Sequence, residues 1–253
     1  MKSSNVFSIN RFILLIRRQV LSGTSILFIA FGAITGLMLL ISGLVAYFSP
    51  EDLADLTNLY YVAMFLGGYI YTSNTFNELH NPQRSYRFLT LPVSTFERLA
   101  SAWLLSAILF PIVAIFAMVI VVFLSNLIIN LTVDPDAFSN IFSHTTLILI
   151  GIYFVTQTVF LLGAIYFRKH NFLKTLLALF VVYFAISIYV SLAGLIIFRP
   201  WEYQFSSFNQ LPTSRLEHFF VELFPQVMKI IFWYVLAPFF LVVSYFSLKE
   251  RQV

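Results

Sequence analysis

Six long apolar runs divide the 253-residue sequence, and only short polar segments separate them. The runs cover about residues 24–48, 58–76, 99–129, 145–167, 173–198 and 226–247. A helix needs about 20 apolar residues to cross a bilayer, and its backbone groups must be paired within the segment. The runs lack the alternation of a membrane β-barrel strand. We therefore expect an all-α integral membrane protein in which residues 1–253 form a single transmembrane domain of six helices.

The basic residues gather in every second gap between these runs. Because cytoplasmic segments of membrane proteins carry the excess of Lys and Arg, this bias predicts that both termini lie in the cytoplasm. The acidic residues mostly fall in the other gaps. The cytoplasmic set is Lys2, Arg11, Arg17, Arg18, Arg84, Arg87, Arg98, Arg168, Lys169, Lys174, Lys249 and Arg251, against Arg199, Arg215 and Lys229 outside.

Composition argues against several classes of function. Only 10% of the residues are charged, and the net charge of +4 forms no clustered basic surface, so we expect no nucleic-acid partner. The absence of cysteine excludes a disulfide, a thiolate metal site and a cysteine nucleophile. The sequence also lacks a G-x-x-x-x-G-K-[ST] phosphate loop and an H-E-x-x-H zinc motif. We expect no catalytic, metal or cofactor site in this chain, and no enzyme activity.

The interiors of the expected spans are almost free of ionisable side chains. Such residues mark proton relays and ion-coupled carriers, so their absence argues against a proton-coupled carrier. Gln157 is the most polar side chain near the middle of a span. We expect it to form a hydrogen bond to another helix.

The segment before the first apolar run is amphipathic. Over residues 7–20, Ile9, Ile13 and Ile16 share one helical face, Arg11 and Arg18 lie nearly opposite, and Leu14 and Leu15 interrupt the polar side. This pattern predicts a helix that lies in the membrane interface with its arginines toward the lipid headgroups. The alternative is a simple basic flank that orients the first span.

Two groups of residues in the first two spans are candidates for function. Gly32, Gly36 and Gly43 share a helical face and would allow another helix to approach closely, as at a dimer interface, although glycine is common in membrane helices. The second span ends in polar residues that either line a cytoplasm-facing pathway or lie in the interface. These candidates for pathway lining are Tyr69, Tyr71, Thr72, Ser73 and Asn74.

The loop between the second and third runs has its own helix signals. Asn81 and Pro82 suit the start of a short helix, Pro92 disfavours its continuation, and Ser94 with Glu97 forms a capping box that starts the third span. A short helix held between two spans is suited to pass force from a partner, but it would also serve as a rigid connection. The residues expected to dock a partner are Asn81, Pro82, Arg84, Tyr86, Arg87 and Phe88.

The outer gap at 199–225 also carries structure signals. Arg199, Pro200 and Trp201 make an aromatic interface anchor. A short amphipathic helix from Thr213 or Ser214 to Phe224 is expected, with a plain loop as the alternative.

Together these features resemble the membrane (permease) subunit of a bacterial ABC exporter of the type 2 class. The resemblance covers nearly the whole chain and includes strings such as 77–80, 91–98, 167–175 and 245–251. It implies an interfacial N-terminal helix, six spans, a cytoplasmic coupling helix and a short extracytoplasmic amphipathic helix. It also implies a second permease subunit, identical or not, and a separate nucleotide-binding ATPase subunit that holds ATP and Mg.

The resemblance implies that the chain lies in the bacterial cytoplasmic (inner) membrane among lipids and exports a cargo. The short outer gap favours an amphiphilic, lipid-like, peptide or small-molecule cargo over a folded protein. The alternative is a non-transporting scaffold, immunity or sensor subunit with the same fold.

Overall fold

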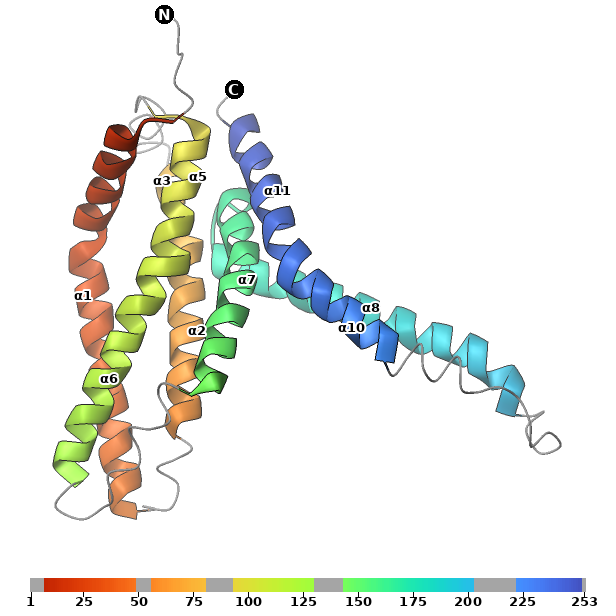
Figure 1. The fold of residues 1–253 in the computed structure, drawn as a ribbon, viewed down its shortest axis with the longest axis horizontal. Coiled ribbons are helices and arrows are strands. Elements are labelled where there is room, and N and C mark those ends of the chain that lie inside the picture. The colour runs from red at the N-terminus through yellow and green to blue at the C-terminus, as the bar shows by residue number, and fades with distance from the viewer. Residues whose placement is uncertain (1–6, 49–55, 81–92, 130–142, 203–221, 252–253) are drawn as a thin grey trace, which may run out of the picture.

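The computed structural model describes residues 7–48, 56–80, 93–129, 143–202 and 222–251, and these contain helices and no strand. Figure 1 shows their order along the chain. The elements are α1 (Ile9–Phe48), α2 (Leu56–Asn74), α3 (Asn77–His80), α5 (Thr95–Leu104), η2 (Leu105–Leu109), α6 (Phe110–Ile129), α7 (His144–Tyr166), α8 (Asn171–Glu202), α10 (Phe224–Ile230), η5 (Ile231–Leu236) and α11 (Ala237–Glu250).

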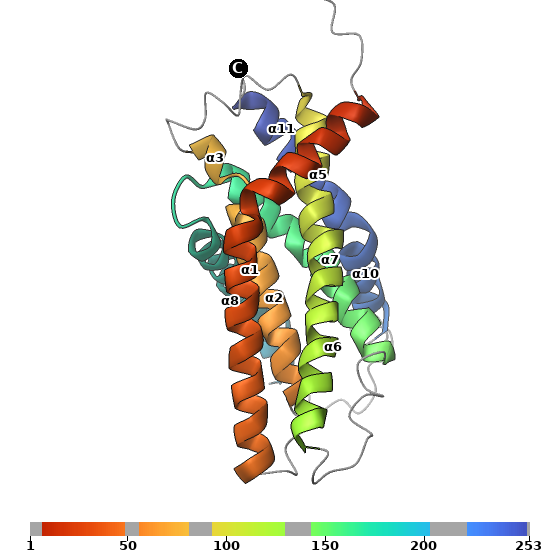
Figure 2. The same ribbon diagram turned by 90° about the vertical axis from the view of Figure 1, so that its left-hand side faces the viewer.

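The helices form an upright bundle and two projecting arms. Helices α1, α2, α6 and α7 stand side by side, and α8 and α10 lead away from them (Figures 1 and 2). The start of α1, α3, the start of α5 and the end of α11 all lie at one end of the bundle, which we call the terminal end. The first and the last described residues therefore lie at the same end of the bundle.

Four helices of the described part of the chain are long and apolar enough to cross a membrane. They cover Thr95–Leu124, His144–Tyr166, Asn171–Leu192 and Phe224–Glu250. The last four expected spans correspond to these helices, which agrees with an integral membrane protein. The first two expected spans lie within α1 and α2, and the total of six stays a prediction.

The N-terminal part of the chain differs from the expected arrangement. Instead of a separate helix at 7–20, α1 runs without a break from Ile9 to Phe48 and bends between its ends (Figure 2). Leu15, which interrupted the expected polar side, is buried, whereas Ile9 and Ile13 on the expected apolar side are exposed. The beginning of α1 packs against α5, so its protein-facing side includes Leu15.

The buried apolar side chains form two clusters at different heights of the bundle. One joins α1, α2 and α6 around Met38, Tyr61 and Val121. The other joins α5, α7 and α11 around Leu161 and Leu248, and Phe76 just before α3 and Leu79 within α3 pack with them. Because the second cluster draws four helices together, it holds the terminal end of the bundle.

Close approach of α7 to its neighbours depends on glycine. A Cβ atom at Gly68 of α2 would overlap the Tyr153 ring of α7. A Cβ atom at Gly163 of α7 would overlap the side chain of Thr175 in α8. Small residues are the usual means by which membrane helices approach closely, because lipid provides little hydrophobic drive for helix association. These glycines therefore allow α7 to pack at the centre of the fold.

The outer gap begins later than expected. Helix α8 continues through Arg199, Pro200 and Trp201 to Glu202, beyond the expected end of the span at residue 198. The amphipathic helix expected from Thr213 or Ser214 lies mostly outside the described residues. Pro225 lies in the first turn of α10, a position where the missing N–H leaves no hydrogen bond unmade.

Candidate functional site

The candidate site lies at the terminal end, where residues 81–92 leave α3 and enter α5. The residues expected to dock a partner, Asn81, Pro82, Arg84, Tyr86, Arg87 and Phe88, lie outside the described residues. The structure does describe the two pieces of chain that hold this segment. They are α3 with His80 as its last residue, and the turn at Ser94 that begins α5.

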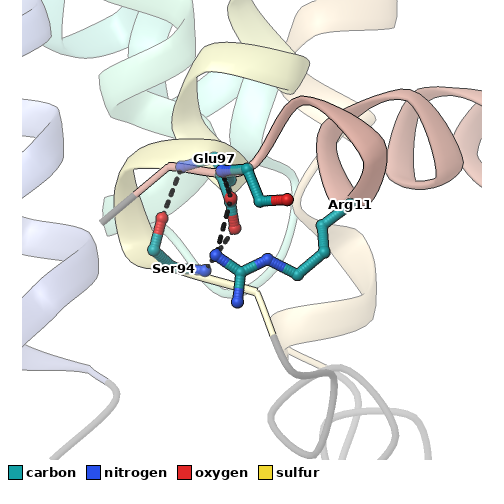
Figure 3. A network of polar contacts seen from close by, with 4 residues as sticks. Arg11, Ser94 and Glu97 are labelled. Carbon is teal, nitrogen blue, oxygen red and sulfur yellow. Dashed lines mark hydrogen bonds and ion pairs between the residues drawn. The ribbon is translucent and has the colours of Figure 1, made fainter. Parts of the chain in front are cut away.

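The predicted capping box at the start of α5 is confirmed. The Glu97 backbone N–H donates to Ser94 Oγ at 3.1 Å, and the Ser94 backbone N–H donates to Glu97 Oε2 at 2.8 Å (Figure 3). The two residues thereby satisfy each other's backbone donors at a helix terminus, where no intrahelical partner exists. This reciprocal pairing defines where helix α5 begins.

The second oxygen of the Glu97 carboxylate ties α5 to the start of α1. Glu97 Oε1 accepts from the Ser8 backbone N–H at 2.7 Å and from Arg11 Nη2 at 3.1 Å. The Glu97 side chain is fully buried, and that of Arg11 is 37% exposed. The guanidinium of Arg11 is thus directed toward a carboxylate of α5 (Figure 3), and the expectation that it faces lipid headgroups stays a prediction.

A second, more exposed ion pair ties α1 to α3. Arg18 Nη2 lies 3.6 Å from Glu78 Oε2, and about two fifths of each side chain is exposed. An exposed pair of this kind contributes little to stability. Its value is positional, because it joins α1 to α3, the helix that directly precedes residues 81–92 in the chain.

Helix α3 is also joined to the ends of α7 and α11. His80 Nε2 donates to the Ala164 carbonyl at 2.8 Å, and Arg251 Nη1 lies 3.3 Å from His80 Nδ1. Arg251 Nη2 donates to the Tyr166 carbonyl at 2.7 Å. Burial lowers the pKa of His80, and the charges of Arg251 and Arg168 lower it further.

These contacts give the two flanks of residues 81–92 fixed positions. One flank, α3, is bound to α1, α7 and α11, and the other flank, the start of α5, is bound to α1. A force on either flank would therefore reach α1, and a force on α3 would also reach the ends of α7 and α11, through contacts that are already formed. No group of three or more His, Asp or Glu side chains suited to a metal occurs among the described residues.

The expected pathway residues lie mostly in helix–helix contacts. The Tyr69 ring stacks on Phe160 at 4.1 Å between centroids, and its hydroxyl lies 2.6 Å from Thr156 Oγ1. Tyr71 stacks on Phe110, and Thr72 and Ser73 are buried. Asn74 is exposed and accepts from Asn77 Nδ2 at 2.9 Å. Within this single chain, four of the five pack between helices, and their role in a pathway stays a prediction.

The glycines proposed for a dimer interface do not make close helix–helix contacts of this kind. A Cβ atom built on Gly32, Gly36 or Gly43 meets no atom within 4 Å. They are not used for packing inside the chain, in contrast to Gly68 and Gly163. The surface around them is open to a further helix, and the predicted dimer contact remains untested.

A buried polar network at mid-bundle was only partly expected. Gln157 Nε2 donates to Ser106 Oγ, which confirms the predicted helix-to-helix hydrogen bond. The Tyr153 hydroxyl donates to the Ser106 carbonyl at 2.9 Å. Ser106 lies in the π-helical turn η2. Phe110 and Pro111 directly follow this turn. Tyr153 and Ser106 were not singled out from the sequence.

The proline explains why the Ser106 carbonyl needs a side-chain donor. The Phe110 N–H bonds the Leu105 carbonyl, and Pro111 has no N–H to offer. The Tyr153 hydroxyl fills that position. The second π-helical turn, η5, likewise ends just before a proline, Pro238. Mid-span prolines were therefore the sequence signal that could have located both turns.

Comparisons of the chain with protein-family models, with curated proteins and with solved structures return no match. Any proposal about its function therefore rests on the chain's own residues.

Proposed function

We propose that this chain is the membrane subunit of an ATP-powered exporter. In this proposal it has six spans, both termini lie in the cytoplasm, and residues 81–92 dock on a separate ATPase subunit that binds ATP and Mg. A second membrane subunit, identical or not, completes the pathway in the bacterial inner membrane. The cargo would be a lipid, a peptide or another small amphiphile.

One observation carries the proposal: the two flanks of residues 81–92 are together fastened to three further helices, α1, α7 and α11. Glu97 binds the start of α1 with a fully buried carboxylate, and His80 binds the ends of α7 and α11. A simple connection between two helices needs none of these cross-links. A segment that receives force from a partner does need them, because otherwise it would deform without moving the helices.

The distribution of charge supports the same orientation. Most of the described basic residues lie in or near the elements that meet at the terminal end, and Arg199 near the end of α8 and Lys229 in α10 are the exceptions. The excess of Lys and Arg on one side predicts a cytoplasmic location for that end. A cytoplasmic ATPase would then have direct access to residues 81–92.

The experiment is an affinity purification of the tagged chain from its own organism in mild detergent, with bound proteins identified by mass spectrometry. We expect a stoichiometric ATPase that carries a phosphate loop. Reversing two charges in the docking segment, with Arg84→Glu and Arg87→Glu together, should abolish its recovery without lowering the amount of chain in the membrane.

A matched control reverses two exposed basic residues outside that segment. Lys169→Glu and Lys174→Glu together change the charge by the same amount in the turn after α7 and the first turns of α8. The ATPase should remain bound to this variant. Equal loss from both double variants would show that charge alone, and not residues 81–92, governs the association.

The alternative is a scaffold, immunity or sensor subunit that does not transport. The same purification separates the two, because such a subunit would be recovered without an ATPase in every detergent tried. Retention of the ATPase by the Arg84 and Arg87 variant would instead keep a transporter but remove these residues from its docking site.

A further inference from the structure

The last turn of α7 is capped by side chains from three other elements. The final carbonyl groups of a helix have no intrahelical donor and must find one elsewhere. Here the Ala164 carbonyl accepts from His80 Nε2 at 2.8 Å and from Asn171 Nδ2 at 3.5 Å. The Tyr166 carbonyl accepts from Arg251 Nη2 at 2.7 Å. The caps come from α3, from α8 and from the residue that follows α11.

The carbonyl partner determines which nitrogen of His80 carries the proton. A carbonyl oxygen only accepts, so Nε2 must donate to Ala164. In the neutral ring, Nδ1 then has a free lone pair. Arg251 Nη1, which is always a donor, lies 3.3 Å from that atom. Neutral His80 therefore bridges Arg251 and the end of α7, and both of its nitrogens are satisfied.

Protonation of His80 would turn this bridge into a repulsion. Both ring nitrogens then donate, so Nδ1–H would point at a guanidinium that has no acceptor to offer. The other charge that acts on the ring is also positive, Arg168 in the turn after α7. Glu78, on the same short helix as His80, is engaged with Arg18 of α1, and Asn171 of α8 is neutral.

The dipole of α7 does not remove this conflict. The C-terminus of a helix favours one nearby cation, by about 0.3–1 kcal/mol at an exposed site. Arg251 already occupies that position through its bond to the Tyr166 carbonyl. A second cation at His80 would face both the helix end and the first cation, and the two positive charges would compete for the same place.

We propose that His80 and Arg251 form an acid-released latch that holds the C-terminal end of α11 and the short helix α3 on the end of α7. Protonation of His80 opens the latch, and deprotonation closes it. The proposal does not depend on transport or on an ATPase, since it concerns contacts within this chain. Because His80 directly precedes residues 81–92, opening would also remove the contacts of α7 and α11 from one of the two flanks of that segment, which would then keep its ion pair to α1.

The direction of the pH response follows from the local environment. Burial and the two arginines lower the pKa of His80, so the ring stays neutral at neutral pH. The latch should therefore be closed at about pH 7.5 and open only below the usual histidine pKa of about 6.5.

The absence of cysteine allows a clean distance measurement. Spin labels on Lys169→Cys and Lys249→Cys, two exposed positions on either side of the latch, report the separation of α11 from the end of α7. In the otherwise unchanged chain, we expect a short, narrow distance distribution at about pH 8 and a longer, broader one at about pH 5.5, with full reversal. An identical distribution at both pH values would overturn the proposal.

Three variants in the same labelled background test the assignment. His80→Gln keeps an N–H for the Ala164 carbonyl but does not titrate, so the separation should stay short at both pH values. Arg251→Gln removes the guanidinium, so the separation should be long already at about pH 8 and no longer respond to pH. His170→Asn alters a neighbouring exposed histidine, whose φ of 53° asparagine tolerates, and should keep the full response. A response that survives in His80→Gln, or disappears in His170→Asn, would also overturn the latch.

Discussion

Helices α7 and α8 are neighbours in sequence and are both long and apolar enough to cross a membrane, yet they differ in what surrounds them. In the most apolar 18-residue stretch of α7, 50% is buried inside the fold, whereas only 6% of the corresponding stretch of α8 is buried. Hydrophobicity does not separate the two, because both qualify as spans. The contacts that their small and polar residues make with other helices do separate them. Helix α7 contains Gly151, Tyr153, Gln157 and Gly163, and each of them contacts or closely approaches another helix.

The contrast shows that an apolar sequence suits a helix to the membrane but does not determine which other helices it packs against. In lipid, helices associate through close packing and hydrogen bonds, because the lipid tails are as apolar as the side chains. Among the side chains described for α8, those of residues 171–192, such contacts occur in the first turns, where Asn171 donates to the Ser73 carbonyl at 3.2 Å and Thr175 meets Gly163. From Leu176 to Leu192 its side chains are exposed.

If contacts between helices hold the fold together, the largest loss of stability should follow removal of the buried Glu97 carboxylate at the terminal end of the bundle. Glu97→Ala deletes half of the capping box together with the bonds to Ser8 and Arg11. We expect a loss of about 2–4 kcal/mol in the free energy of unfolding, since a cap and a charged hydrogen bond are both lost. Thermal unfolding in mild detergent, followed by tryptophan fluorescence, measures it.

Glu97→Gln separates the two contributions. Glutamine still serves in a capping box but carries no charge for Arg11, so its loss should be clearly smaller than that of alanine. Equal losses for the two variants would mean that the ion pair, and not the cap, is the important contact.

The next largest effect concerns glycine. Gly163→Leu would drive a side chain into Thr175 and separate α7 from α8, with an expected loss of about 1–3 kcal/mol. Gly36→Leu points into open space and should leave the stability of the isolated chain within about 0.5 kcal/mol of the wild type. The same unfolding assay compares them.

Gly36→Leu has a second use. If Gly32, Gly36 and Gly43 contact a second membrane subunit, the leucine should reduce crosslinking between subunits even though the chain itself remains stable. Undiminished crosslinking would exclude this face as the dimer contact.

A smaller loss of stability is expected when a single hydroxyl group is removed. Tyr153→Phe removes the donor to the Ser106 carbonyl, and membrane hydrogen bonds of this kind are worth about 0.6–1.7 kcal/mol. Tyr183→Phe removes the hydroxyl of a tyrosine on α8 that is 67% exposed, and it should have almost no effect. A loss of similar size at both positions would contradict the contrast between α7 and α8.

The smallest expected effect is the pH dependence from His80. Its pKa is lower in the folded chain than the usual value of about 6.5, so the unfolded chain binds the proton more readily. Stability should therefore be complete above about pH 6.5 and fall as the pH drops toward the folded pKa. The slope of unfolding temperature against pH should flatten in His80→Gln and persist in His170→Asn.

The features that the sequence predicted are local ones. Four membrane-length helices follow from runs of apolar residues, and the capping box at Ser94 and Glu97 follows from a spacing of three residues. Gln157 was identified because a polar side chain in mid-span needs a partner nearby. Each inference depends on a short stretch of chain and on the rule that backbone and polar groups in lipid must be paired.

The features that escaped prediction are contacts between distant parts of the chain. Arg11 and Glu97 are 86 residues apart, and His80 and Arg251 are 171 residues apart. Helical periodicity placed Leu15 on the polar side, because it assumed that residues 7–20 lie alone in the membrane interface. The packing of α1 on α5 selected a different face, and no pattern within the segment could show that.

The π-helical turn ahead of Pro111 changes the direction in which the side chains of the following helix point. Each residue of an α-helix turns the chain by about 100°, so a turn that accommodates an additional residue shifts the direction of every side chain beyond it. Before η2 the helix faces α1 and α11, and after it the helix faces α1 and α2. Pro111→Ala would restore the missing N–H and allow the turn to tighten, which would rotate Met118 and Val121 out of the cluster they share with Tyr61. One proline thus sets which neighbours the far half of a membrane helix meets.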